Sequence, residues 1–164
     1  PEKNKWFNHQ YLQKQSNESL AESFYTMNAE KIEDSYGMTN LIKIVGLVKE
    51  RANFINDLWD LSDYFFEAPT SYDEKAAKNW KEETPALMHQ VISELEKIAD
   101  FTSVNIETLL KEWMTTNDIG MGKVMQPLRL SLVGALKGPH LFDIIEMIEK
   151  AETIKRIEKA IANL

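Results

Sequence analysis

Apolar residues recur three or four positions apart along most of the chain, which is the spacing that lines one face of an α-helix. This pattern predicts helices at about residues 17–27, 39–64, 73–81, 84–99, 105–114 and 151–162. Nowhere do apolar and polar residues alternate with period two in a run of β-branched residues, so no sheet is expected. The pattern therefore predicts an all-α protein.

One break in the helical pattern divides the chain. Pro, Thr and Ser cluster in the segment EAPTSYDE, residues 67–74, which lies between two helical patterns. With 164 residues and a hydrophobic content of 43%, the chain is long enough to bury a sizeable core. We predict two packed helical subdomains, residues 1–70 and residues 71–164.

Residues 120–142, GMGKVMQPLRLSLVGALKGPHLF, hold four of the six glycines and two of the five prolines. Apolar residues at helical spacing predict one helix between the turns, and Arg129 lies on a neighbouring face of that helix. Gly138 followed by Pro139 predicts a helix end and a new helix start. We expect two helices joined by a tight, exposed corner with an arginine near it. Close packing of a helical hairpin would also account for these glycines.

Composition limits the class of protein. Cysteine is absent, which excludes disulfides and thiolate metal sites, and no apolar run approaches the roughly 18 residues of a membrane span. No charged-then-apolar leader is found either, so a cytoplasmic protein without membrane contact is expected. The chain begins with an aromatic cluster that includes Trp6 and Phe7. We interpret this as a cut within a longer protein, with these aromatics packed in a core or at a domain interface.

The net charge of -7 argues against a general nucleic-acid binder, because phosphate contacts require cations. The charge is unevenly distributed: residues 120–164 carry +2, and the remainder of the chain carries -9. An acidic body of this kind cannot hold a duplex by counterion release alone. An RNA partner would have to be bound at a small, well-shaped site, and DNA is not expected as a partner.

Motifs for catalysis are absent. The three histidines, His9, His89 and His140, lie far apart, and none has a second histidine or a carboxylate cage at metal-ligand spacing. No phosphate-binding glycine loop and no G-x-S-x-G motif is present. The chain by itself is therefore expected to catalyse nothing and to need no metal or cofactor.

The segment GKVMQPLRLSLVGALKGPHLFDIIEMIEK resembles the C-terminal anticodon-binding region of bacterial glutamyl-tRNA synthetases, in which G-x-x-x-Q-P-L-R-x-A-L-x-G-x-x-x-x-P-x-L-F recurs. KNKWFNHQYL at residues 3–12 and LVKERANFINDL at residues 47–58 are similar to two further segments of the same family, in the same order. The resemblance therefore covers nearly the whole chain. It departs at His140, where a small residue is frequent, and at Glu149, where the family has glycine.

The resemblance implies a function. The full-length enzyme would join glutamate to its tRNA with ATP and magnesium, and this fragment would recognise the anticodon loop of tRNA(Glu). The missing N-terminal catalytic domain would be its partner within the same chain, and a monomer is expected. Residues 1–70 would form a stem-contact-like helical linker with a first anticodon-binding subdomain. Residues 71–164 would form the second.

The resemblance also implies which residues contact the tRNA. Arg51 would recognise the third anticodon base, and Arg129 would contact the anticodon loop. The corner would receive the splayed bases, with Pro139 and Leu141 offering apolar faces. The complete set implied by the resemblance is Arg51, Arg129, Gly138, Pro139, Leu141 and Lys111.

The choice of arginine is informative, because the chain has 16 lysines and only three arginines. A guanidinium presents a planar fork that pairs with two acceptors on a base edge, which an ammonium cannot do. By spacing alone, Arg51 would be an ordinary solvated or ion-paired residue within the predicted helix 39–64, and Arg156 would be a surface or helix-end charge. The rival interpretation of the whole chain is a helical protein-interaction module with no RNA role.

Overall fold

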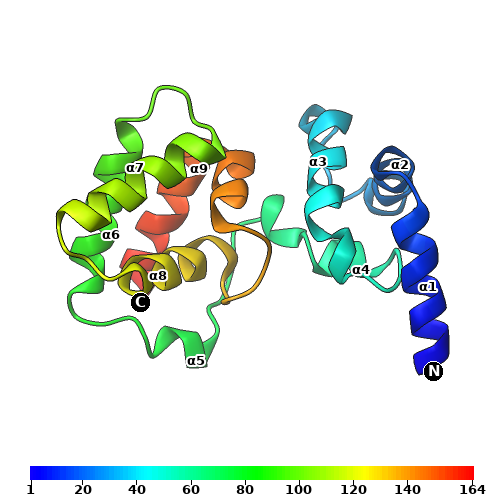
Figure 1. Ribbon diagram of the computed structural model, residues 1–164, viewed down its shortest axis with the longest axis horizontal. Helices are drawn as coiled ribbons and strands as arrows, with labels where there is room; N and C mark the ends of the chain where they lie inside the picture. The colour runs from blue at the N-terminus through cyan, green and yellow to red at the C-terminus, as the bar shows by residue number, and fades with distance from the viewer. The chain divides into compact units, whose positions relative to one another are not determined.

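Every regular element of the chain is helical. The computed structural model describes residues 1–164 and contains nine α-helices, three short 3₁₀ helices and no strand (Figure 1). The prediction of an all-α protein is confirmed. The chain forms two compact units, Pro1–Phe66 and Glu67–Leu164, and the division falls at the start of the EAPTSYDE segment.

The first unit is built on two helices, α2 and α3, which pack against each other. Its elements are α1 Glu2–Lys14, α2 Asn17–Asn28, η1 Asp34–Tyr36, α3 Met38–Val48, η2 Lys49–Arg51, α4 Asp57–Asp60 and η3 Asp63–Phe65. Leu20 and Phe24 of α2 and Ile44 of α3 are fully buried, as the helical periodicity requires. The rings of Phe24, Trp59 and Phe66 form a mutual cluster that extends the core, with centroid distances of 6.3 Å from Phe24 to Trp59, 5.5 Å from Trp59 to Phe66 and 6.0 Å from Phe24 to Phe66.

The long helix predicted over residues 39–64 is wrong. α3 ends at Val48, and a 3₁₀ turn follows at Lys49–Arg51. Beyond the turn, the carboxylate of Asp57 accepts hydrogen bonds from the backbone N–H groups of Asn53 and Phe54, each 3.0 Å long. Side chains that bond to nearby backbone groups offer the chain an alternative to the helical ladder. Arg51 consequently lies in a single 3₁₀ turn and not within a long α-helix.

The aromatic residues of α1 are on the surface of the unit. Trp6, Phe7 and Tyr11 are more than half exposed, and Leu12 is the buried residue of this helix. Within this chain they therefore do not pack in a core, which was one of the two predictions made for them. Packing against another part of a longer protein stays a prediction.

The second unit is a cluster of helices around α9. Its elements are α5 Glu74–Ala77, α6 Thr84–Glu96, α7 Ser103–Thr116, α8 Met121–Val133 and α9 Leu141–Asn163. α6, α7 and α8 all pack against α9 (Figure 1). The predicted helix over residues 73–81 shortens to the single turn α5. Apolar residues of four helices are fully buried in this core, among them Met88, Ile106, Leu110, Leu128 and Ile144.

A kink at Glu149 divides α9. Glu149 has φ 71° and ψ 167°, a conformation that is not helical and that residues with a side chain rarely adopt. The turn before the last helical segment thus forms even though a glutamate stands where similar sequences have glycine. A helical segment precedes the kink, and a second one follows it at the position predicted for the last helix.

Arg156 is buried, and its prediction as a surface charge is wrong. The side chain is only 2% exposed; Nε donates a 2.9 Å hydrogen bond to Glu152, and Nη1 donates a 2.8 Å hydrogen bond to the carbonyl of Leu132. Leu132 lies in the last turn of α8, where carbonyl groups have no partner within the helix. Arg156 therefore caps α8 from α9 and ties the two helices together.

Candidate nucleic-acid interface

The corner between α8 and α9, residues 134–140, carries two of the six predicted tRNA-binding residues, Gly138 and Pro139, and Leu141 directly follows it. α8 ends at Gly134, which has a left-handed conformation with φ 86° and donates its N–H to the carbonyl of Leu130. The carbonyl of Gly134 accepts a 2.8 Å hydrogen bond from the N–H of Asp73. Gly138 has φ 103°, a backbone conformation that residues with a side chain rarely adopt.

Arg129 holds the corner in place. Its Nη1 donates hydrogen bonds to the carbonyl oxygens of Lys137 and Pro139, at 2.9 and 2.8 Å. These two carbonyls lie on either side of Gly138, so one guanidinium nitrogen fixes the path of the chain through the corner. The sequence placed Arg129 near the corner, and only the structure shows that it bonds to the corner backbone.

The corner is exposed at Leu136, Lys137 and His140, as expected, but the prediction that Pro139 and Leu141 offer apolar faces is wrong. Both side chains are buried, and Leu141 is only 1% exposed. They sit at the start of α9, which begins at Leu141 and packs against α7 and α8. The large apolar residue that the corner does expose is Leu136, whose exposed fraction is 44%.

Two hollows flank Leu136. The first has a volume of about 250 Å³ and is lined by Met125, Gln126, Arg129, Leu136 and Leu141. The second has a volume of about 360 Å³ and lies between α5 and the corner, where Lys75, Asn79, Leu136 and Lys137 are among its lining residues. Leu136 thus forms a ridge between the two hollows. Sequence reasoning missed this residue, because helical spacing predicted it to be part of an apolar stripe.

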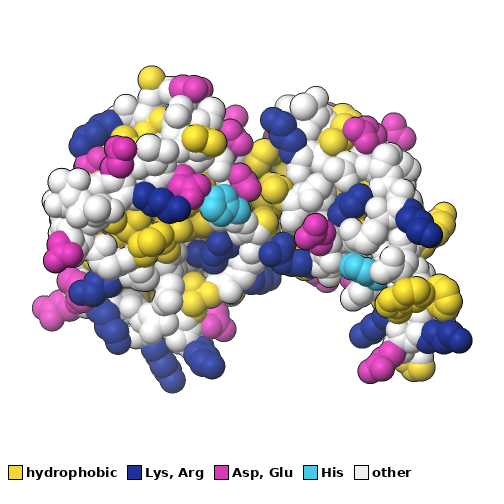
Figure 2. Space-filling view, viewed as in Figure 1, with side chains coloured by type: hydrophobic (Ala, Val, Ile, Leu, Met, Phe, Trp, Pro, Cys, Tyr) yellow, Lys and Arg dark blue, Asp and Glu magenta, His cyan; other side chains and the backbone are white.

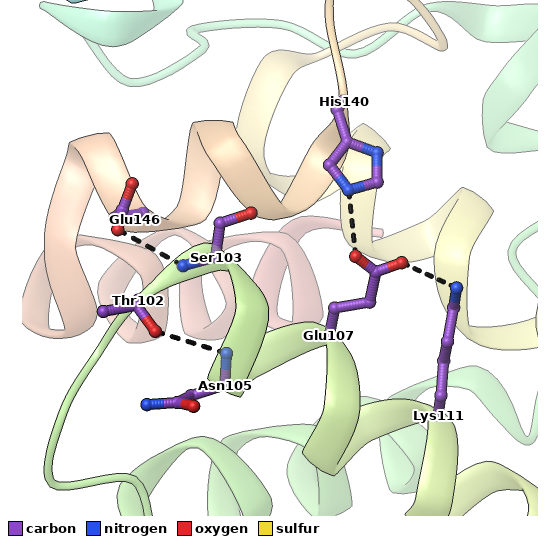
Figure 3. A network of polar contacts seen from close by, with 7 residues as sticks. All are labelled: Thr102, Ser103, Asn105, Glu107, Lys111, His140 and Glu146. Atoms are coloured by element: carbon purple, nitrogen blue, oxygen red, sulfur yellow. Dashed lines mark hydrogen bonds and ion pairs between the residues drawn. The ribbon is translucent and has the colours of Figure 1, made fainter.

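Lys111 joins the corner through a polar network. Figure 3 shows the carboxylate of Glu107 between two basic side chains: Lys111 Nζ lies 2.6 Å from one oxygen, and His140 Nε2 lies 3.2 Å from the other. The hydrogen bond from Lys111, and then that from His140, hold the pKa of Glu107 below its usual value. Lys111 is exposed but already paired. A phosphate would therefore compete with Glu107 for it.

Arg51 lies in the first unit, on a well-anchored turn. Gln13 Nε2 donates to the carbonyl of Lys49 at 2.7 Å, and His9 Nδ1 lies 2.8 Å from the carbonyl of Ala52. Both contacts come from α1 and hold the backbone on either side of Arg51. The side chain of Arg51 is exposed, and no carboxylate pairs with it. Of the two ordinary alternatives for Arg51, the ion-paired one is excluded and the solvated one is what the structure shows.

Comparison with known proteins decides the family. The model of the family described as "Anticodon binding domain" matches residues 10–161. The chain belongs to the anticodon-binding domain family. This anticodon-binding domain is 66% identical over 164 residues to the glutamate–tRNA ligase of Flavobacterium johnsoniae, and 69% identical over 168 residues to that of Flavobacterium psychrophilum. Each alignment covers 100% of this chain but only 32% of the relative's length.

A solved structure shows the same arrangement of helices. The anticodon-binding domain superposes on a glutamate tRNA ligase from Elizabethkingia meningosepticum, solved in complex with its amino acid, with a TM-score of 0.89 and 46% identity. The match covers 98% of this chain and 32% of that one. The resemblance to glutamyl-tRNA synthetases predicted from the sequence is thereby confirmed.

The anticodon-binding domain has no helix with the length and apolar character to cross a lipid bilayer. It also has no group of three or more side chains placed to hold a metal ion. Several Lys and Arg side chains lie on the lower side of the second unit in Figure 2, the side on which Figure 1 places α5.

Proposed function

We propose that this chain is the part of a longer glutamate–tRNA ligase that recognises the anticodon loop of tRNA(Glu). The observation that carries the proposal is the match of the anticodon-binding family model to residues 10–161. The chain spans 32% of its glutamate–tRNA ligase relatives, which supports a longer parent protein. The remainder would supply the catalytic domain with its ATP and magnesium, and we expect a cytoplasmic monomer.

Arg51 suits the recognition of one base edge. Its guanidinium is exposed, carries no ion pair, and extends from a turn whose backbone is held by α1 on both sides. A planar fork on an anchored backbone loses less entropy when it forms two hydrogen bonds with a base. Arg51 would recognise the third anticodon base, which is cytosine in glutamate anticodons and guanine in glutamine anticodons.

The corner would hold the remaining anticodon bases against its backbone. Arg129 holds the carbonyls on both sides of Gly138, so the corner is organised before RNA binds. The hollow beside Arg129 contains Gln126, whose amide offers both a donor and acceptors to an unstacked base. Arg129, Gly138, Pro139 and Leu141 would thus act chiefly by shaping this site.

The experiment is a pair of aminoacylation series with the full-length enzyme, one on tRNA(Glu) and one on tRNA(Gln). Arg51→Gln should lower the ratio of kcat/KM for tRNA(Glu) to kcat/KM for tRNA(Gln) by about 5- to 150-fold, the range for one lost base contact. Arg51→Lys should lower this ratio by a smaller factor, because lysine keeps the positive charge but lacks the planar fork of the guanidinium. Lys43→Gln, which removes a charge from an exposed site on α3, is the matched control and should leave the ratio unchanged.

Two outcomes would contradict the proposal. Equal losses on both tRNAs in Arg51→Gln would make Arg51 a phosphate contact without a role in discrimination. A chain that binds the cognate anticodon stem-loop no better than an unrelated RNA hairpin would favour the rival, a protein-interaction module. Fluorescence polarisation with both hairpins at several salt concentrations measures this preference, because general phosphate binding weakens with salt to the same extent for the two RNAs.

A further inference from the structure

The hollow between α5 and the corner has fixed walls. Asp73, immediately before α5, donates its N–H to the carbonyl of Gly134, and Arg129 holds the carbonyl of Lys137. α5 lies below α8 and the loop that leads into α9 in Figure 1. The volume of about 360 Å³ is within the range of small-ligand pockets, about 300–1,000 Å³. It is therefore a preformed space and not a gap between mobile loops.

The lining of this hollow suits a nucleotide. Lys75 from α5 and Lys137 from the corner are both exposed, and neither has a carboxylate partner. The one carboxylate of the lining, that of Asp73, accepts a 2.8 Å hydrogen bond from the N–H of Ala76 at the start of α5. Two cations without ion-pair partners favour an anion, and the Asn79 amide adds both a donor and acceptors for a base edge.

Leu136 links this hollow to the one beside Arg129. It lines both hollows and is 44% exposed, so an extended single strand that crosses the corner would meet it between two sites. Apolar side chains such as leucine insert between neighbouring bases and separate them in other nucleic-acid complexes. On such a strand, one base would lie on the Arg129 side of Leu136 and the adjacent nucleotide on the Lys75 side.

We propose that the hollow between α5 and the corner binds a second, adjacent nucleotide of the single-stranded loop, with Lys75 and Lys137 at its phosphate and Asn79 at its base. Leu136 acts as the wedge that keeps this nucleotide unstacked from the base beside Arg129. The inference rests on the proposed function, since it takes the anticodon loop as the RNA. It adds a site on α5, which the six residues implied by the resemblance do not include.

The first test measures the affinity of this chain for a fluorescent anticodon stem-loop from tRNA(Glu) at several salt concentrations. Lys75→Ala should weaken binding and reduce the slope of log affinity against log salt by about 1, the value for one lost phosphate contact. Lys78→Ala is the matched control: Lys78 directly follows α5 and is exposed, but it does not line the hollow. It should leave the slope unchanged.

The second test examines the wedge with 2-aminopurine, a base whose fluorescence rises when it is unstacked, placed at successive loop positions. Two adjacent positions should brighten on binding to the wild-type chain. Leu136→Ala should abolish the rise at one of them and weaken binding about 5-fold or more, the lower end for loss of one base contact. Leu136→Met should retain the signal, because it keeps an apolar side chain of similar length.

The outcomes separate the two proposals. If the wild-type chain binds the cognate loop but Lys75→Ala and Lys78→Ala have the same salt slope, the second nucleotide site is wrong and anticodon recognition stands. An unchanged 2-aminopurine signal in Leu136→Ala would likewise overturn the wedge. If the wild-type chain does not prefer the cognate loop at all, the proposed function fails, and this inference fails with it. Circular dichroism of each variant shows that the helices are intact.

Discussion

Replacing Glu149 by glycine should stabilise the second unit. Glu149 has φ 71° and ψ 167°, a region in which a Cβ atom clashes with the backbone at a cost of about 1–3 kcal/mol. Its side chain is exposed and forms no hydrogen bond or ion pair, while its carbonyl accepts a 2.7 Å hydrogen bond from Thr153 that glycine would keep. The substitution therefore removes strain without removing a contact.

The expected gain follows from two opposing terms. Taking about 2 kcal/mol for the relieved strain, and about 1 kcal/mol for the extra entropy that glycine loses on folding, leaves a gain of about 1 kcal/mol. For a unit of roughly 100 residues, a change of this size raises Tm by about 4–8 °C. Differential scanning calorimetry of the wild-type chain and the variant measures the shift directly.

The matched control is Glu149→Ala, which removes the carboxylate but keeps the Cβ atom. It should give no gain in Tm, and neither should Glu149→Asn, because asparagine tolerates positive φ in the left-handed helical region and not at a ψ of 167°. A glycine variant with an unchanged or lower Tm would refute the strain argument. An equal gain in the alanine variant would show that the carboxylate, and not the backbone, is unfavourable at this position.

Three further predictions concern the second unit. Arg156→Met should lower the free energy of unfolding, measured by urea titration, by about 1.5–3 kcal/mol, because the carbonyl of Leu132 loses a charged hydrogen-bond donor. A decrease below about 0.5 kcal/mol would contradict the role of Arg156 as a cap of α8. Gly134→Ala should lower Tm, because φ is 86° and the new Cβ would lie 2.8 Å from the Cβ of Pro69, whereas a neutral result would mean that the loop adjusts freely. The lowered pKa of Glu107 means that its stabilising contribution is present above its usual value near 4.5 and is lost as pH falls through the lowered pKa. Glu107→Gln should therefore show a smaller loss of stability in acid than the wild-type chain, and identical acid limbs in thermal unfolding would refute the linkage.

The spacing of apolar residues identified the helices in which buried positions recur every three or four residues along the whole element. The prediction for residues 17–27 corresponds to α2, Asn17–Asn28, and the prediction for residues 105–114 lies within α7, Ser103–Thr116. It failed over residues 39–64, where apolar residues keep helical spacing but the Asp57 carboxylate bonds to the backbone of Asn53 and Phe54. The spacing of apolar residues cannot reveal this competition between side-chain and helical hydrogen bonds, because the competition does not depend on hydrophobicity.

The predicted tRNA-binding residues were identified from a sequence motif, and the motif could not show which contacts each side chain makes. The sequence located the region of the corner but not its ends: Gly138 with Pro139 predicts a helix end followed by a helix start, whereas α8 ends at Val133 and α9 begins at Leu141. The Glu107–Lys111 pair was also accessible from the sequence, because residues four apart share one face of a helix. Its partner His140 was not, since 33 positions separate it from Glu107.

The sequence by itself determined the helical class, the break before residue 74 and the corner, because each depends on local spacing or on the backbone preferences of glycine and proline. Only the tertiary structure decided that Arg129 bonds to the corner carbonyls, that Arg156 is buried and that Leu136, and not Leu141, is exposed. Local spacing specifies which residues share a face of a helix. Which partner meets that face depends on how α7, α8 and α9 pack together, and that packing is a property of contacts distant in the sequence.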